Sequence, residues 1–334
     1  MKNLNDFPRL RLGLLPTPLH RLDNVSRLLG KNIYVKRDDL TGVGLGGNKV
    51  RKLEYLLAQA QAQGADYVLT TGGAQSNHAM LTAACVNKLG MKAILILKKK
   101  GVTAREGNQL LNDLLGAEVR FLDTPDYADI YAEMERISAE LAARGHKAYC
   151  IPVGGSVPLG SLGYVNGMRE AAEQAAALGV RFDRIVCATG SGGTHAGVAL
   201  GARIYFPGAR VVGMAVDTEP FAEIVPRLIR ETAALLAYDL PAGADAVELV
   251  DMTGPGYAIP SEAGNAAVRL MAESEGIILD PVYTGKAFAG LVEQCRSGAF
   301  ADAENILFLH TGGAGGLFAL GRAVPAANCA SRAS

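Results

Sequence analysis

One lysine stands out because of the glycines that precede it. The segment GVGLGGNKVRK, residues 42–52, places four glycines ahead of Lys49, where a helix is expected to begin. The positive end of a helix dipole disfavours an ammonium group there, and the glycines allow a planar ligand to approach the backbone closely. Both effects favour a neutral amine at Lys49. A neutral amine is the nucleophile that forms an imine with an aldehyde.

A second segment has the features of a phosphate site. Residues 184–206, RIVCATGSGGTHAGVALGARIYF, have the pattern of a strand, a glycine-rich turn and a helix. Backbone N–H groups in such a turn, together with the helix N-terminus, can hold a phosphate dianion. The glycines could instead serve only close packing of the strand on the helix. The residues expected to form the phosphate cup are Thr189, Gly190, Ser191, Gly192, Gly193 and Thr194.

The same turn departs from the dinucleotide-binding pattern at one position. That pattern requires a third glycine where His195 stands, although Asp217 follows the next strand, where an acidic residue would bind a ribose. The hydroxyl groups of the turn suit a compact phosphate monoester. A phosphate cup and an activated lysine together indicate pyridoxal 5'-phosphate. A nicotinamide-dependent oxidoreductase that uses this turn and Asp217 stays open as an alternative.

Alternating strand and helix patterns position these residues. Short apolar runs rich in β-branched residues end in glycine or polar turns, and alanine- and leucine-rich segments with helical spacing follow them. The runs are too apolar for a sheet with one solvated face, so we expect parallel strands covered by helices on both sides. Ligands bind at the carboxyl ends of such strands. Four glycine-rich loops are expected there, at residues 70–78, 153–163, 188–197 and 310–316.

Composition argues against several functional classes. Thirty-three Lys and Arg residues balance thirty-three Asp and Glu residues, so no net charge favours nucleic acid or an anionic membrane as a partner. No run of eighteen apolar residues occurs, and the five cysteines include no CxxC pair. Without an HExxH motif or clustered carboxylates, a catalytic metal is not expected. We expect a cytoplasmic protein with a small neutral or zwitterionic substrate.

Seven segments together resemble one enzyme family. VKRDDLTGVGLGGNKVRKLEYLLA, TTGGAQSNHAMLTAA, IPVGGSVPLGSLGYVNG, ATGSGGTHAG, GPGYAIP, LDPVYTGKA and FLHTGGAGGLFAL are similar, in this order, to segments of the D-cysteine desulfhydrase and 1-aminocyclopropane-1-carboxylate deaminase family. The resemblance implies an α/β protein of PLP fold type II (tryptophan synthase β-like), with two doubly wound, open, twisted sheets flanked by helices. A large cofactor-binding domain, residues 1–49 and 160–334, would carry a small inserted domain, residues 50–159. The resemblance also implies a homodimer.

The resemblance implies roles for two parts of the site. Lys49 would bind the cofactor aldehyde covalently and move protons at the carbons of the substrate. Ser76, Asn77 and His78 match the substrate loop of the family, where backbone N–H groups and the asparagine side chain receive the α-carboxylate of the substrate and the ring hydroxyl of the cofactor. A helix N-terminus suits a carboxylate. Ser76 and Asn77 could also be simple N-caps, and capping is compatible with binding.

Two tyrosines and a threonine match positions beside the cofactor ring and the substrate. Tyr283 and Thr284 stand in LDPVYTGK, where the deaminase branch is expected to have a glutamate in place of Thr284, next to the pyridine nitrogen. Threonine cannot keep that nitrogen protonated, which favours β-elimination over cyclopropane opening. Tyr257, in GPGYAIP, matches a second pocket tyrosine that would bind the substrate or protonate the departing sulfur. Tyr283 could instead be a buried core tyrosine with a satisfied hydroxyl.

Three residues depart from the family pattern. Met80 and Leu81 stand where an arginine and a glutamine are common, and Val157 stands where asparagine is usual. We predict pyridoxal-phosphate-dependent β-elimination on a small β-substituted amino acid, with D-cysteine giving pyruvate, hydrogen sulfide and ammonia. A 1-aminocyclopropane-1-carboxylate deaminase, an L-cysteate sulfo-lyase and a catalytically silent sensor are the alternatives. Met80 removes one cation that a sulfonate would need.

Overall fold

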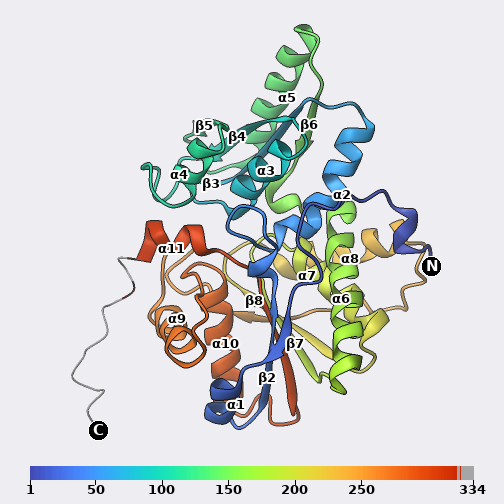
Figure 1. Cartoon of the computed structure of the whole chain (residues 1–334), viewed down its shortest axis with the longest axis vertical. Coiled ribbons are helices and arrows are strands. Elements are labelled where there is room, and N and C mark those ends of the chain that lie inside the picture. The colour runs from blue at the N-terminus through green and yellow to red at the C-terminus, as the bar shows by residue number, and fades with distance from the viewer. Residues whose placement is uncertain (322–323, 325–334) are drawn as a thin grey trace.

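The computed structural model describes residues 1–321 and residue 324, and it contains two separate β-sheets (Figure 1). The larger sheet has six strands in the order β1-β2-β10-β7-β8-β9. β1 is antiparallel to β2, and the other neighbours are parallel. The bounds are Leu19–Arg21 (β1), Asn32–Arg37 (β2), Arg184–Thr189 (β7), Arg210–Ala215 (β8), Glu248–Asp251 (β9) and Asn305–His310 (β10). The chain therefore starts this sheet, leaves it after β2 and returns at β7.

The smaller sheet has four parallel strands in the order β5-β4-β3-β6. The bounds are Tyr67–Gly73 (β3), Lys92–Lys98 (β4), Glu118–Leu122 (β5) and Ala148–Ile151 (β6). All four strands lie between β2 and β7 in the sequence, so the smaller sheet is inserted into the chain of the larger one.

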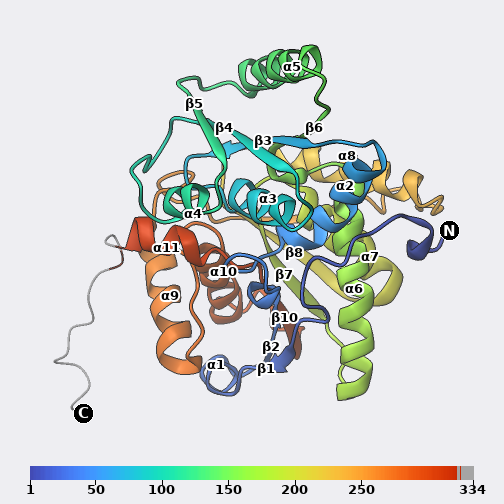
Figure 2. The same ribbon diagram turned by 45° about the horizontal axis from the view of Figure 1, so that its top comes forward.

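Helices cover both faces of each sheet. The apolar cluster on one face of the larger sheet includes side chains of α1, α9 and α10, and the clusters on its other face involve α6, α7 and α8. In Figure 2, α5 lies on one side of the smaller sheet, and α3 and α4 lie on the other. The α-helix bounds are Asp23–Leu29 (α1), Lys49–Ala62 (α2), Asn77–Asn87 (α3), Asn108–Leu114 (α4), Tyr127–Ala143 (α5), Pro158–Leu178 (α6), Gly193–Tyr205 (α7), Phe221–Leu235 (α8), Glu262–Glu275 (α9), Thr284–Arg296 (α10) and Ala314–Leu320 (α11). The short 3₁₀ helices are Leu4–Asp6 (η1), Asp38–Leu40 (η2) and Val153–Gly155 (η3).

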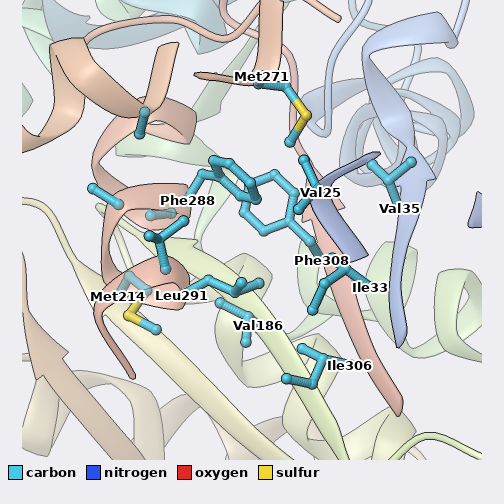
Figure 3. Packing of buried hydrophobic residues seen from close by; sticks show 14 of the residues in the cluster. Val25, Ile33, Val35, Val186, Met214, Met271, Phe288, Leu291, Ile306 and Phe308 are labelled. Atoms are coloured by element: carbon cyan, nitrogen blue, oxygen red, sulfur yellow. The ribbon is translucent and has the colours of Figure 1, made fainter. Parts of the chain in front are cut away.

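Aromatic and branched side chains fill the space between the larger sheet and the helices α9 and α10 (Figure 3). Phe288 of α10 and Phe308 of β10 are fully buried and pack with their ring centroids 5.3 Å apart. Met271 of α9 and Val35 of β2 belong to the same cluster. Burial of a side chain of this size contributes about 1.5–3 kcal/mol. This packing holds the carboxyl ends of β7, β8 and β10 in fixed positions, and the site lies beyond those ends.

The predicted fold class is confirmed, with two sheets flanked by helices and parallel central strands. β3, β4, β6, β7, β8 and β10 lie where apolar runs predict strands. The sequence did not predict β1, β2, β5 or β9. β5 and β9 are four or five residues long and largely half-buried, while β2 ends in Lys36 and Arg37, so none of these strands has a long apolar run. The domain boundaries at residues 49 and 160 stay a prediction.

Four of the cysteines are free thiols: Cys85 and Cys187 are buried, Cys295 is partly buried and Cys150 is exposed. Cys329 lies outside the described residues. Within residues 1–321 and 324, no helix is both long enough and apolar enough to cross a membrane.

Candidate active site

A cavity lies where loops of the two sheets meet. The smaller sheet contributes the end of β3, the start of α3 with Ser76, Asn77 and His78, and the first residue of α5, Tyr127. The larger sheet contributes the β7–α7 loop, Asp217 after β8, and the loops that hold the two predicted tyrosines. Lys49, at the start of α2, also lines this cavity. The structure therefore brings together residues that are more than 200 positions apart in the sequence.

The loop before α2 delivers Lys49 because its glycines adopt conformations that other residues avoid. Gly46 has φ +75°, and a Cβ there would lie 1.7 Å from the carbonyl oxygen of Asp39. Gly47 forms an antiparallel bridge with Gly312, which joins this loop to the loop after β10. Lys49 is the first residue of α2, as the sequence predicts, and its Nζ donates to Asn48 Oδ1 at 3.0 Å.

The amine of Lys49 loses its proton more readily than an ordinary lysine. Burial lowers the pKa of Lys49 to about 8, and the nearby carboxylate of Asp280 opposes this shift. In the sequence, the expected helix dipole and the glycines that let a ligand approach the backbone predict a neutral amine. In the structure, burial is the largest cause of the lowered pKa, because the ammonium form loses hydration inside the cavity.

The turn after β7 forms a cup that is open at the N-terminus of α7. Gly192 is the N-cap residue of α7 and has φ +83°. As a glycine, it has no side chain that could accept from the N–H groups of the first turn. Gly193 N donates to Ser156 Oγ at 3.2 Å, and Ser156 Oγ donates to Ser191 Oγ at 2.9 Å. Asn48 Nδ2 donates to Thr194 Oγ1 at 2.9 Å and ties the lysine loop to the cup. Uncapped N–H groups and hydroxyls of this kind suit a phosphate.

Lys52 lies behind the cup, and the sequence analysis missed it. This lysine is fully buried, and its Nζ donates to Gly154 O at 2.6 Å and to Ser156 Oγ at 3.2 Å. A Cβ at Gly193 would lie 2.6 Å from the same Nζ. Burial, reinforced by Lys49, holds the pKa of Lys52 well below its ordinary value, and a bound dianion would raise that pKa again. The only signal in the sequence is the spacing, since Lys52 follows Lys49 by one helical turn.

The start of α3 provides the second polar wall of the cavity. Ser76 is the N-cap of α3, and its Oγ accepts from Ala79 N at 3.2 Å, which agrees with the capping role considered for it. Thr70 Oγ1 donates to Ile151 O at 2.8 Å, so at its 2.9 Å contact with His78 the threonine oxygen accepts from Nε2–H. His78 Nδ1 is then a buried acceptor without a protein partner. Burial, aided by Lys49 and Lys52, holds the pKa of His78 well below its usual value, so the ring is neutral.

Tyr257 and Tyr283 meet at the cavity wall. Their hydroxyl oxygens are 2.6 Å apart and their rings pack edge to face, with centroids 6.1 Å apart. Burial raises the pKa of both hydroxyls, which keeps both tyrosines protonated. One hydrogen lies between the two oxygens, so the other hydroxyl hydrogen of the pair is available to a ligand.

Two of the predicted cofactor contacts use their hydroxyl groups elsewhere and do not line the cavity. Thr284 Oγ1 donates to Asp280 Oδ1 at 2.7 Å and accepts from Asp280 N at 2.9 Å. Thr189 Oγ1 is 3.0 Å from Nδ1 of His195, the residue that replaces the third glycine of a dinucleotide turn. Direct cofactor contacts by Thr189 and Thr284 stay predictions. In the structure the hydroxyl groups of these two residues contact His195 and Asp280, respectively.

The departures at Met80, Leu81 and Val157 lie in apolar packing rather than in the cavity wall. All three belong to, or pack against, the cluster beneath the smaller sheet. A Cβ at Gly44 would lie 3.1 Å from Met80 Sδ, and a Cβ at Gly47 would lie 3.0 Å from Leu81 Cδ1. Met80 and Leu81 therefore support the lysine loop, and the effect of all three departures on the substrate would be indirect.

A buried ion network anchors the first turn of α2 from its other side. Arg51 is fully buried and donates from Nε and Nη2 to the two carboxylate oxygens of Asp38, at 2.7 and 2.8 Å. Arg51 also donates to both carboxylate oxygens of Glu170, and Tyr164 OH donates to Asp38 Oδ2 at 2.6 Å. Burial alone would raise the pKa of Asp38, but Arg51 outweighs it and holds that pKa at about 2.

The residues present fit a phosphorylated pyridine aldehyde. The cup offers uncapped N–H groups above a buried lysine, the amine of Lys49 lies in the same cavity, and a Cβ at Gly190 would lie 3.0 Å from the Tyr283 ring. Across the described part of the chain, no group of three or more His, Cys, Asp or Glu residues is arranged to hold a metal ion.

Comparisons with known proteins point in the same direction. Residues 10–312 match the family described as "Pyridoxal-phosphate dependent enzyme". A putative 1-aminocyclopropane-1-carboxylate deaminase of Pyrococcus furiosus is 43% identical over 321 residues, which cover 95% of each chain. A D-cysteine desulfhydrase of Salmonella choleraesuis is 43% identical over 325 residues, covering 96% of this chain and 98% of the relative. The crystal structure of an ACC deaminase homologue superposes with a TM-score of 0.90 at 44% identity, covering 96% of both chains.

Proposed function

The chain belongs to the family of pyridoxal-phosphate-dependent enzymes, and from this premise we propose that it catalyses β-elimination on a small β-substituted amino acid, with D-cysteine as the leading substrate. With one water, D-cysteine gives pyruvate, ammonia and hydrogen sulfide. The observation that carries the proposal is the meeting of Lys49, the α7 cup and the α3 N-terminus in one cavity. When bound, pyridoxal phosphate supplies an electron sink for the α-carbon of the amino acid.

The chain's own residues divide the binding work between the two sheets. The α7 cup and Lys52 would bind the phosphate, because the start of α7 lines the cavity and Lys52 Nζ lies directly behind Gly193. The first turn of α3, with Ser76 and Asn77, would bind the α-carboxylate of the amino acid and orient the bond that breaks. The pyridine ring would lie between these ends, beside Tyr283.

Proton transfer requires one base and one acid. Lys49 would remove the α-proton, and its pKa of about 8 lets a useful fraction of the amine be neutral near pH 7. The Tyr257–Tyr283 pair would hold the leaving sulfur with its free hydroxyl hydrogen. Asp280, close enough to raise the pKa of Lys49, would stabilise the lysine after it accepts the proton.

The charges around the cavity favour a neutral β-substituent. Among the described lining residues, Lys49 is the only lysine or arginine, and Asp217 is a carboxylate. The lowered pKa values of His78 and His195, both caused mainly by burial, keep these rings uncharged. A sulfonate would therefore lack a free cation, whereas a thiol needs none. Thr284 brings no charge to the ring, which supports elimination over cyclopropane opening.

A product assay across five amino acids tests the substrate. D-cysteine, L-cysteine, β-chloro-D-alanine, L-cysteate and 1-aminocyclopropane-1-carboxylate are supplied in parallel, and pyruvate, 2-oxobutanoate, sulfide and sulfite are measured. We expect pyruvate and sulfide from D-cysteine. Release of 2-oxobutanoate would identify a deaminase, sulfite from L-cysteate would identify a sulfo-lyase, and bound cofactor without any product would identify a sensor.

Replacement of the lysine tests the chemistry independently of the substrate. Lys49→Ala should lose pyruvate release together with the near-visible absorbance that covalent attachment of the cofactor produces. Lys88→Ala is the matched control, because Lys88 donates to Leu12 O on the smaller-sheet side and does not line the cavity. Unchanged absorbance in Lys49→Ala would remove Lys49 from its assigned role.

We also carry forward two proposals: the homodimer, from the family resemblance, and the cytoplasmic location, from the cysteine pattern of the sequence. Sedimentation of the holoenzyme at several concentrations tests the first, and a monomer throughout would contradict it.

A further inference from the structure

The substrate loop is held from outside the cavity by the segment that leads into α4. Gln75 Nε2 donates to Val102 O at 2.9 Å and to Glu106 O at 3.2 Å. Both acceptors are backbone carbonyls, so the amide orientation of Gln75 is fixed. Gln75 Oε1 accepts from Asn108 N at 2.8 Å, which places the first residue of α4 directly against the loop.

The side chain of Asn108 then determines the orientation of a second amide. Asn108 is fully buried, and its Nδ2 is 2.9 Å from Gln75 O and 2.7 Å from the side chain of Asn77. Because Gln75 O can only accept, the Asn108 atom that faces it must be the NH₂ group. The second hydrogen of this NH₂ points to Asn77, so the Asn77 atom that faces Asn108 must be Oδ1.

The opposite orientation of Asn108 has no hydrogen-bond partners among the described residues. Asn108 Oδ1 makes no hydrogen bond and lies against α11, where a Cβ at Gly315 would be 2.0 Å away. An exchange of its oxygen and nitrogen would place an oxygen against two acceptors, at Gln75 O and Asn77 Oδ1. One backbone carbonyl therefore sets both amides.

We propose that Asn108 is a positioning residue that turns the Asn77 amide so that it presents only N–H donors to the cavity. Asn77 lines the cavity, and with Oδ1 held by Asn108 its free Nδ2 hydrogens are the atoms available to a ligand. The site therefore selects an oxygen that accepts, such as the anionic ring oxygen of pyridoxal phosphate. The inference rests on the proposed function only in taking that cofactor as the occupant.

The test compares two replacements of Asn108 by the visible absorbance of bound cofactor as a function of pH. In Asn108→Asp the carboxylate has only acceptors, so Asn77 must rotate to donate to it and present Oδ1 to the ring oxygen. The ring oxygen of the cofactor then loses a hydrogen-bond donor. This loss should raise the midpoint pH of the absorbance titration by about one pH unit. Asn108→Ala leaves Asn77 free to keep its NH₂ on the ring oxygen, so we expect a smaller shift of the same sign.

A double-mutant cycle separates positioning from a general disturbance of the loop. In an Asn77→Ala background, neither change at Asn108 should shift the absorbance titration further, because its effect passes through the Asn77 amide. A shift of equal size in both backgrounds would show a direct effect of charge or of loop distortion and would overturn the proposal. Should Asn108→Asp not fold, the Asn108→Ala cycle carries the same decision, and zero coupling there overturns the proposal as well.

This experiment is separable from the assay of function. Absorbance of the bound cofactor does not depend on which amino acid the enzyme uses, so failure of every substrate in the panel leaves the titration valid. Absence of cofactor absorbance in the wild-type protein would contradict both proposals together.

Discussion

Two helix N-termini face the same cavity, and they are prepared for their ligands in different ways. α3 begins after a glycine-containing strand end and is capped by its own Ser76, which accepts from Ala79 N. α7 begins after a glycine turn, has no side-chain cap at Gly192, and stands in front of the buried Lys52. Each helix has one N–H taken by a serine, since Gly193 N of α7 donates to Ser156 Oγ, but only α7 has a buried lysine behind its first turn. This difference supports the proposal that the α7 unit binds a phosphate and the α3 unit a single carboxylate.

The largest expected effect comes from crowding the α7 cup from behind, at Gly193. Gly193→Ala places a methyl group 2.6 Å from Lys52 Nζ and 2.8 Å from Ser156 Cα, and the second contact is with backbone. Strain of about 1–3 kcal/mol corresponds to a loss of cofactor affinity on the order of a hundredfold at its upper end. The measurement is a fluorescence titration of apo-protein with pyridoxal phosphate. Gly316→Ala is the matched control, because an added methyl meets nothing within 4 Å there. Wild-type affinity in Gly193→Ala would contradict the assignment of the α7 cup as the phosphate site.

Removal of the cation behind the cup should have the next largest effect. Lys52→Met keeps an unbranched side chain of similar length and removes the amino group that donates to Gly154 O and Ser156 Oγ. We expect affinity for pyridoxal phosphate to fall about thirtyfold, in line with loss of a charged hydrogen bond, and affinity for pyridoxal to change little. Equal losses for the two ligands, measured by the same titration, would place Lys52 outside phosphate binding.

The lysine between the two helix starts gives a smaller, pH-dependent effect. Below its pKa of about 8, Lys49 is mainly an ammonium, and above it mainly a free amine that can attack the aldehyde. The initial rate of cofactor attachment to apo-protein should therefore rise roughly fivefold from pH 7 to pH 8 and level off above pH 9. A stopped-flow absorbance series measures this rate. A rise that continues beyond pH 10 would mean that burial does not lower the pKa of Lys49.

The smallest effect concerns the cap that distinguishes α3 from α7. Ser76→Ala and Ser261→Ala each remove an N-cap, since Ser261 Oγ accepts from Gly264 N at the start of α9. Each change should lower the free energy of unfolding by about 1 kcal/mol in chemical denaturation. Only Ser76→Ala should also raise KM for the amino acid, by about threefold. A similar KM change in both variants would assign the effect of Ser76 to helix stability alone.

The sequence was sufficient to place residues at strand ends and helix starts and insufficient for the side-chain contacts that they make. Lys49, Ser76 and the glycines of the cup lie in local strand–turn–helix patterns, and the structure places them where those patterns predict. Lys52 and Asn108 have no such pattern, because their roles depend on Gly154 and Gln75, which come from other segments. The local pattern also fails to show where a hydroxyl points.

Thr284 illustrates that last limit. The family resemblance implies a contact of Thr284 with the cofactor ring, but the sequence gives no sign that the Asp280 carboxylate accepts from its hydroxyl. The same turn brings the carboxylate of Asp280 close enough to affect the pKa of Lys49. Such reciprocal bonds depend on backbone angles within one turn, and residue spacing alone does not determine them.

The first turn of α2 constrains changes in chain length more strongly than changes of residue type. Lys49, Arg51 and Lys52 face the cavity, the buried carboxylates and the back of the cup, respectively. One inserted or deleted residue would rotate everything beyond it by about 100° and shift it by about 1.5 Å, so the three contacts could not all survive. Insertions and deletions should therefore be absent from residues 49–52 in any functional library, whereas the exposed turn at residues 63–64, which follows the same helix, should accept them.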